Sequence, residues 1–195
     1  MRVDKLNPET LTPRQREVFD KIAGKRGRLG APFQVWLNSP ELCERVEALG
    51  SFLRWDSHLP LRLRELSLLL AARHFDAQYS WNAHVDVALA EGIPAAAIDA
   101  IARNVAPAFD NDEDAVFYDL CTQILREHFV SQETFDRAVA TFGVEGVVDT
   151  IGSLGNFSML AMLLNTFEVD LQADRTPPYP DIRGYERVSG VSVDA

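Results

Sequence analysis

The chain has 195 residues, of which 47% are hydrophobic, and this suggests a single domain with a sizeable core. Its formal net charge of −10 argues against nucleic acid or an anionic membrane surface as a partner, because both require clustered lysine and arginine. The longest apolar run, residues 66–72, is far shorter than the roughly 20 residues of a transmembrane helix. No apolar signal region opens the chain, so we expect a cytoplasmic protein.

Almost every segment has the pattern of a helix, and strand alternation is missing. The segment 12–15 (Thr-Pro-Arg-Gln) has the form of a capping box with proline at the first position, and it predicts a helix that stops near Gly24. Residues 27–32 are predicted to be a loop. The segment 39–42 (Ser-Pro-Glu-Leu) predicts the next helix start in the same way.

The segment 61–75 is apolar nearly all round, which is typical of a central, buried helix. A break follows, and Ser80 is the predicted N-cap of the next helix, which runs to Glu91 and is closed by Gly92. Further helices are predicted to begin at residue 94 and to cover residues 112–129, 131–143 and 145–167, and the segment 131–134 (Ser-Gln-Glu-Thr) predicts the start of the helix at 131–143. We divide the chain into an N-terminal helical extension (1–60), a helical core (61–167) and an extended, proline-containing arm (168–195), which is either mobile or wrapped on a neighbouring subunit.

Glu65 lies on the same face of its predicted helix as Leu61, Leu69 and Ala72. A carboxyl group set among leucines is poorly solvated, which suits a proton donor or a base that works near neutral pH. The alternative is that Glu65 pairs with a nearby arginine and only ties helices together.

His84 lies on the next predicted helix, three residues after Trp81. Imidazole is the side chain best suited to carrying protons near pH 7, but a core histidine bonded to a buried acid would show the same pattern. The Tyr79 hydroxyl is placed to stabilise a developing oxyanion, and Trp81 is either a substrate contact or a core residue. We expect no metal site, because His74 and His84 do not provide a recognised ligand spacing.

Three groups of residues resemble the carboxymuconolactone decarboxylase family. They are the segment 63–66 (Leu-Arg-Glu-Leu), the pattern Tyr79-x-Trp81-x-x-His84, and Ala88 with Gly92. The close resemblance covers residues 61–101, and a looser one includes residues 29–33 and 39–42. The resemblance implies an all-α, AhpD-like helical bundle with a central helix pair, assembled as a homo-oligomer, either a trimer or a hexamer.

The redox branch of that family places a CxxC pair before the motif histidine. Here Ala77 and Ser80 stand at the two sulfur positions, and the only cysteines, Cys43 and Cys121, lie outside the motif. Two free thiols are the simplest account of these cysteines, although a disulfide between them stays open. Without a thiolate beside the histidine there is no nucleophile for a peroxide, so we expect no CxxC-type peroxidase activity.

The other branch resembles cofactor-independent decarboxylases that act on 4-carboxymuconolactone in aromatic-compound catabolism. It implies a carboxy-lyase for a small carboxylated lactone or ring acid, with no cofactor. The alternatives are an AhpD-like antioxidant protein and a non-catalytic ligand-binding member of the fold. The implied catalytic residues are Glu65, His84 and Tyr79, and the implied substrate-binding residues are Trp81, Arg64 and Arg73, with Arg62 as a further candidate.

Overall fold

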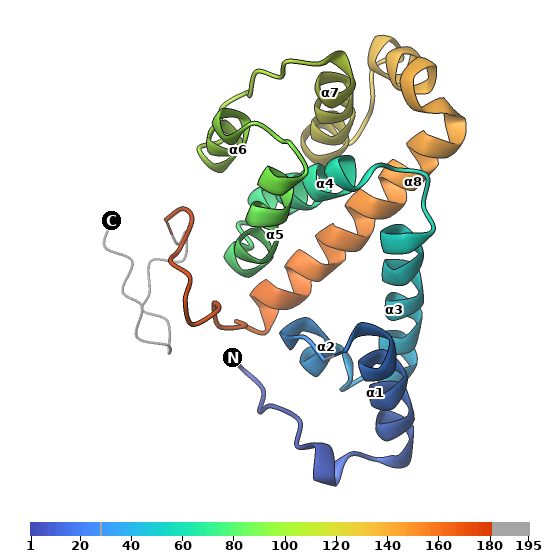
Figure 1. Cartoon of the computed structure of the whole chain (residues 1–195), viewed down its shortest axis with the longest axis vertical. Helices are drawn as coiled ribbons and strands as arrows, with labels where there is room; N and C mark the ends of the chain where they lie inside the picture. Colours follow the sequence, from blue (N-terminus) through green and yellow to red (C-terminus); the bar gives the residue numbers. More distant parts are fainter. Residues whose placement is uncertain (28, 181–195) are drawn as a thin grey trace.

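The computed structural model describes residues 1–27 and 29–180. Over these residues the fold is all-helical, with no strand, as the sequence predicted (Figure 1). A short 3₁₀ turn (Pro8–Thr10) precedes eight α-helices. They are α1 (Pro13–Arg26), α2 (Ala31–Trp36), α3 (Pro40–Trp55), α4 (Leu61–His74), α5 (Gln78–Ala90), α6 (Ala95–Ala102), α7 (Asp112–Glu127) and α8 (Gln132–Thr166).

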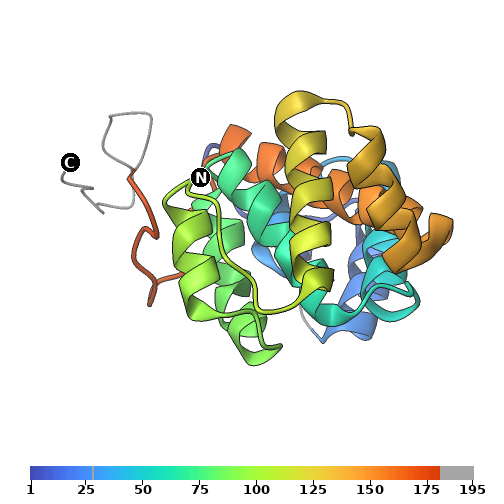
Figure 2. The same cartoon turned by 90° about the horizontal axis from the view of Figure 1, so that it is seen from above.

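Helix α4 is the centre of the fold, as its all-round apolar sequence predicted. Every residue from Glu65 to Ala72 is buried, and α4 packs against α5, α7 and α8 (Figures 1 and 2). Full burial of one leucine contributes roughly 1.5–3 kcal/mol to folding, so the run of leucines in α4 is a major source of stability. At the α4–α8 contact, small residues allow a close approach, and the hydroxyls of Ser67 and Ser153 lie 2.8 Å apart.

Three of the four predicted helix starts are confirmed by the structure. Thr12 forms the full capping box with Gln15, and the Ser131 side chain accepts from the backbone N–H of Thr134. Ser39 is the N-cap residue of α3, although its side chain makes no capping hydrogen bond. The predicted cap at Ser80 is wrong, because α5 begins two residues before it, directly after the tight turn at Asp76, and Ser80 lies buried inside the helix.

The segment predicted to be a loop at residues 27–32 ends in a helix. Pro32 lies in the first turn of α2. Backbone N–H groups in the first turn have no partner within the helix, so the missing N–H of proline costs no hydrogen bond there. Trp36 and Leu37 then pack into a small second core with Val18 and Ile22 of α1. The error matters for function, because α2 forms one wall of the candidate site.

The two helices predicted for residues 131–143 and 145–167 form one long element, α8, which is interrupted at Gly143. The backbone of Gly143 has φ 69° and ψ 171°, a combination that is open almost only to glycine. The predicted boundary is therefore correct, and α8 changes direction at this kink (Figure 1).

We expect Gly143→Ala to lower the free energy of unfolding by about 1–3 kcal/mol, because a side chain there forces a strained backbone. Gly24 is the matched control, since it lies within α1 with no atom near its missing Cβ. Gly24→Ala should raise the free energy of unfolding by about 0.5–1 kcal/mol. Urea denaturation of both variants measures this, and equal effects of the two substitutions would contradict the assigned strain.

Among the described residues, only α8 is long and apolar enough to cross a membrane when judged by length and composition. Within its most apolar segment, 44% of the residues are buried inside the protein. The core helix of a soluble protein meets the same two criteria, so the observation is weak evidence for a membrane span.

The beginning of the predicted C-terminal arm packs on its own chain. The side-chain amides of Gln78 and Asn82 donate to the carbonyl oxygens of Tyr179 and Thr176 at 2.6 and 2.8 Å. The Tyr179 ring is buried edge-to-face against Trp81, with ring centroids 5.7 Å apart. Up to residue 180 the arm therefore lies along α5 of the same chain, which differs from the predicted mobile or partner-bound arm. Its remainder, residues 181–195, lies outside the described residues.

Candidate active site

Glu65 and His84 meet where α4 and α5 pack together. Glu65 is on the buried side of α4 and is 6% exposed, whereas His84, one and a half turns into α5, is partly exposed. The Nδ1 atom of His84 lies 2.7 Å from Oε2 of Glu65. The turn between the helices, with Asp76 in a left-handed conformation (φ 51°), brings these two residues into contact.

The contact with Glu65 fixes the protonation pattern of the imidazole. A carboxylate accepts hydrogen bonds, so Nδ1 of His84 carries its proton toward Glu65. Among the described residues none is hydrogen-bonded to Nε2 of His84. That nitrogen therefore remains for a substrate, either as a base or, when the ring is protonated, as an acid whose charge Glu65 stabilises.

The pair lines a cavity of about 190 Å³, which we call the Glu65–His84 cavity. Its wall comes from five helices and is mostly apolar, with few polar side chains. Such a site suits a small, partly apolar molecule with one or two polar groups. The apolar contributors include Phe33 (α2), Val46 and Leu53 (α3), Leu61 (α4), and Phe157 and Leu160 (α8), and the polar ones are Glu65, His84, Arg54, Arg64 and Asn156.

Arg64 lines this cavity, as predicted, but it is committed to a structural contact. Its Nη1 donates to the backbone carbonyl of Leu53 at 2.7 Å and also to the backbone carbonyl of Arg54. Burial lowers the pKa of the Arg64 guanidinium, and the nearby positive charge of Arg54 acts in the same direction. Arg64 thus fastens α4 to the end of α3.

The structure does not bring Arg73 or Arg62 to the cavity. Arg73 is ion-paired with Asp76 and donates from Nε to the carbonyl of Ala102 at 2.7 Å, facing a different part of the protein. Arg62 is ion-paired with residues at the start of α7. Within this chain, Arg73 is therefore not a lining residue of the Glu65–His84 cavity, and its role as a substrate contact stays a prediction.

Arg54 is the cationic residue that the sequence analysis missed. It lies in the last turn of α3, is exposed, and lines the Glu65–His84 cavity. No carboxylate among the described residues lies within ion-pair distance of it. A basic residue in the last turn of a helix normally interacts with the helix dipole, so its position in the sequence alone did not mark it as functional.

Tyr79 lines a neighbouring cavity of about 390 Å³, which also includes His84, Arg54 and Phe33. Ser80 contributes to the same wall, and its hydroxyl is buried with no hydrogen-bond partner among the described residues. Trp81 lines neither cavity. It follows Ser80 directly, and each residue of a helix is rotated by about 100° from the one before. The indole therefore points away from the Ser80 side chain and into the core. Its burial favours the core interpretation of Trp81, and the substrate contact stays a prediction.

Both cysteines are fully buried and away from these cavities. Burial, with the nearby charges of Glu47 and Glu44, raises the pKa of the Cys43 thiol to about 11. Burial also raises the pKa of the Cys121 thiol. Neither thiol forms a reactive thiolate at neutral pH. Within the described parts of the chain, no three histidine, cysteine or acidic side chains are grouped closely enough to hold a metal ion.

The sequence model of the carboxymuconolactone decarboxylase family matches residues 40–117. This segment belongs to the carboxymuconolactone decarboxylase family. No curated protein matches the chain. The carboxymuconolactone decarboxylase segment runs from the start of α3 into α7 and includes Arg54, Glu65 and His84. It does not include Phe33 of α2 or Phe157 of α8, which complete the cavity wall.

Proposed function

We propose that the protein is a cofactor-independent carboxy-lyase, similar to 4-carboxymuconolactone decarboxylase, which acts on a small carboxylated lactone or ring acid formed in aromatic-compound catabolism. The observation that carries the proposal is the Glu65–His84 hydrogen bond at the wall of an apolar cavity that also contains Arg54. This arrangement combines a proton carrier, a cation and a poorly solvated space.

Arg54 suits the binding step. Its positive charge at the rim attracts an anionic substrate, and its guanidinium donates hydrogen bonds to the bound substrate. The departing carboxylate then faces apolar side chains such as Phe157. A carboxylate is less stable there than in water, whereas the charge-dispersed transition state loses less solvation, so loss of CO2 is favoured.

His84 suits the proton-transfer step. When the bond from the ring carbon to the carboxylate breaks, CO2 leaves and the electron pair moves into the conjugated ring system. The carbon that gains electron density then takes a proton from Nε2 of protonated His84, which recovers a proton from solvent. Glu65 stabilises the imidazolium through Nδ1. Each turnover consumes one proton and releases one CO2.

The direct test is turnover of 4-carboxymuconolactone by the purified chain, followed by CO2 release and by absorbance of the product. A panel of other cyclic carboxylic acids is tested in parallel, with hydrogen peroxide and an organic hydroperoxide as alternative substrates. Decarboxylation of any ring acid supports the proposal. Peroxide turnover without decarboxylation contradicts it, and so does ring-acid binding without turnover, which is the behaviour of a non-catalytic binding protein.

We expect Arg54→Gln to raise KM about 10- to 100-fold, with a smaller effect on kcat, because a charge-assisted hydrogen bond contributes about 1.5–3 kcal/mol. Arg45→Gln is the matched control, since Arg45 is an exposed arginine of the same helix that pairs with Glu41. Steady-state kinetics of the two variants checks this. An unchanged KM in the Arg54 variant would show that another group binds the anion.

We also propose that the chain forms a homo-oligomer, a trimer or a hexamer as the family resemblance implies. Val144, Val148 and Ile151 follow one face of α8 and are 65%, 60% and 52% exposed. An apolar stripe of this kind is typical of a contact surface. Light scattering coupled to size-exclusion chromatography should show an oligomer that Val148→Asp dissociates, and a wild-type monomer would contradict the proposal.

A further inference from the structure

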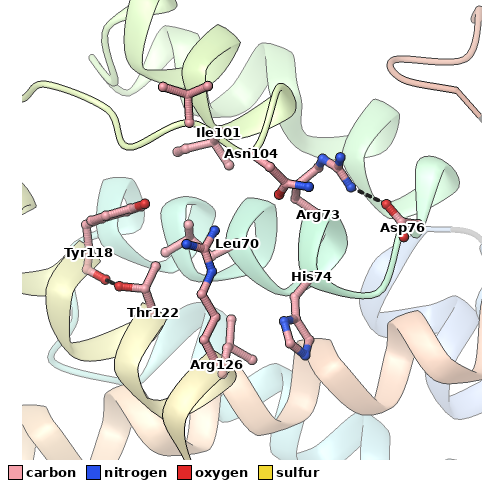
Figure 3. Close-up of a pocket in the computed structure, with 11 residues that line it drawn as sticks. Leu70, Arg73, His74, Asp76, Ile101, Asn104, Tyr118, Thr122 and Arg126 are labelled. Atoms are coloured by element: carbon pink, nitrogen blue, oxygen red, sulfur yellow. Dashed lines mark hydrogen bonds and ion pairs between the residues drawn. The ribbon is translucent and has the colours of Figure 1, made fainter.

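A second cavity, of about 410 Å³, lies between the end of α4, the start of the α6–α7 connection, and α7 (Figure 3). None of its lining residues belongs to the Glu65–His84 cavity or to the neighbouring Tyr79 cavity. It is therefore separate from the proposed decarboxylation site.

The charges around this cavity are unbalanced. Arg73, His74 and Arg126 line it, and Asp76, the only carboxylate among the described residues of its wall, is already ion-paired with Arg73. The pKa of His74 is lowered, mainly by burial and further by the positive charges of Arg126 and His128. Because Arg73 is paired and a lowered pKa favours the neutral form of His74, Arg126 is the uncompensated positive charge among the described residues of this wall, and it favours an anion in the cavity.

Arg73 and Arg126 differ in how they are held. Arg73 is fixed by its ion pair with Asp76, by its hydrogen bond to Ala102, and by its position 4.5 Å from the ring centroid of Tyr179. Arg126, in the last turn of α7, has no ion pair or hydrogen bond with any described residue. Figure 3 shows Asn104 beside Arg73, whose guanidinium is turned toward Asp76, with Tyr118 on the opposite side and Arg126 between them.

Other polar groups around the space can donate hydrogen bonds to an anion. The Tyr118 hydroxyl and the Asn104 side-chain amide line it together with the two guanidinium groups. Leu70, Ile101 and Leu125 supply an apolar wall. A ligand that matches these surfaces has an anionic group at one end and an apolar body at the other.

We propose that this cavity binds a small organic anion, with its carboxylate or phosphate between Arg126 and Arg73 and its apolar body against Leu70 and Ile101. Arg126 is the group that the ligand neutralises, and Arg73 is the preformed part of the site. The assignment does not depend on the reaction at His84.

Binding is tested on the full-length protein with benzoate and phenyl phosphate, which share an apolar ring and differ in the anionic group. Benzyl alcohol is the neutral counterpart. Titration followed by amide chemical shifts should place the changes at the end of α4 and along α7. Binding of either anion in preference to the alcohol supports the proposal and identifies the preferred anionic group.

Arg126→Gln should weaken anion binding at these amides by at least about tenfold, the loss expected for one charge-assisted contact. Arg137→Gln is the surface control, because Arg137 is an exposed arginine of α8 paired with Asp119. Arg54→Gln controls for anion binding at the other site. Unchanged binding in both controls supports the proposal, whereas loss in the Arg54 variant, no loss in the Arg126 variant, or equal binding of benzyl alcohol overturns it.

Discussion

His84→Gln is expected to lower kcat for the proposed decarboxylation by about 10²- to 10⁴-fold, the usual contribution of a positioned acid–base group. Glutamine can still donate a hydrogen bond to Glu65, so the contact between α4 and α5 is retained and the variant should fold. It has no group that titrates near neutral pH, so the proton can no longer be delivered to the ring carbon. The measurements are kcat on the best ring acid and the thermal unfolding midpoint.

His58→Gln is the matched control, because His58 is exposed and its imidazole pairs with Glu145 on the surface. Its turnover should equal that of the wild type. Turnover in the His84 variant close to the wild-type rate would remove His84 from the chemistry, even if the decarboxylation itself is confirmed. A large fall in the unfolding midpoint instead of in kcat would assign His84 a structural role.

Asp114→Ala is expected to lower the free energy of unfolding by about 3 kcal/mol, because it removes one partner of an ion pair that is largely excluded from water. Asp114 has no exposed side-chain surface, and its Oδ1 lies 2.9 Å from Nε of Arg62. The pair joins the first turn of α4 to the first turn of α7. The expected loss of unfolding free energy is at the low end of the range for breaking a buried ion pair. The reason is that Arg62 is partly exposed and keeps its second contact, which is with Glu113.

Asp99→Ala is the comparison for an exposed pair. Asp99 and Arg103 are four residues apart on the surface, with both side chains more than half exposed. Solvent screens such pairs, so urea denaturation should show no measurable loss. Equal losses in the two variants would mean that the α4–α7 ion pair contributes no more than a surface contact.

The acid–histidine pair could be predicted because its signals are local. The leucines around Glu65 mark the buried side of one helix, and His84 follows on the next helix after a short turn. Two helices joined by such a turn pack against each other, so residues facing the shared side meet. The all-α fold and the boundary at Gly143 also follow from patterns within single segments.

The remaining site residues depend on contacts between distant segments. Arg54 faces the cavity only because the end of α3 packs beside α4, and no pattern within α3 indicates that packing. The face that Trp81 presents to the core is covered by Tyr179, almost a hundred residues later in the chain. Arg73 was a candidate substrate contact because it lies on the same predicted helix as Glu65. In the structure it is held by its ion pair with Asp76, in the turn that follows α4.

The residues of the cavity wall come from separate parts of the chain, and this separation affects how substrate preference can evolve. The acid–histidine pair is held by two consecutive helices, whereas Phe33 precedes them and Phe157 and Leu160 follow much later. Substitutions at Phe33 and Leu160 are expected to alter the room available for a substrate and to leave the hydrogen bond between Glu65 and His84 in place, whereas Phe157 also packs against the His84 ring, with ring centroids 6.4 Å apart. Proton chemistry and substrate fit can therefore diverge independently, so two proteins with the same pair can process different acids.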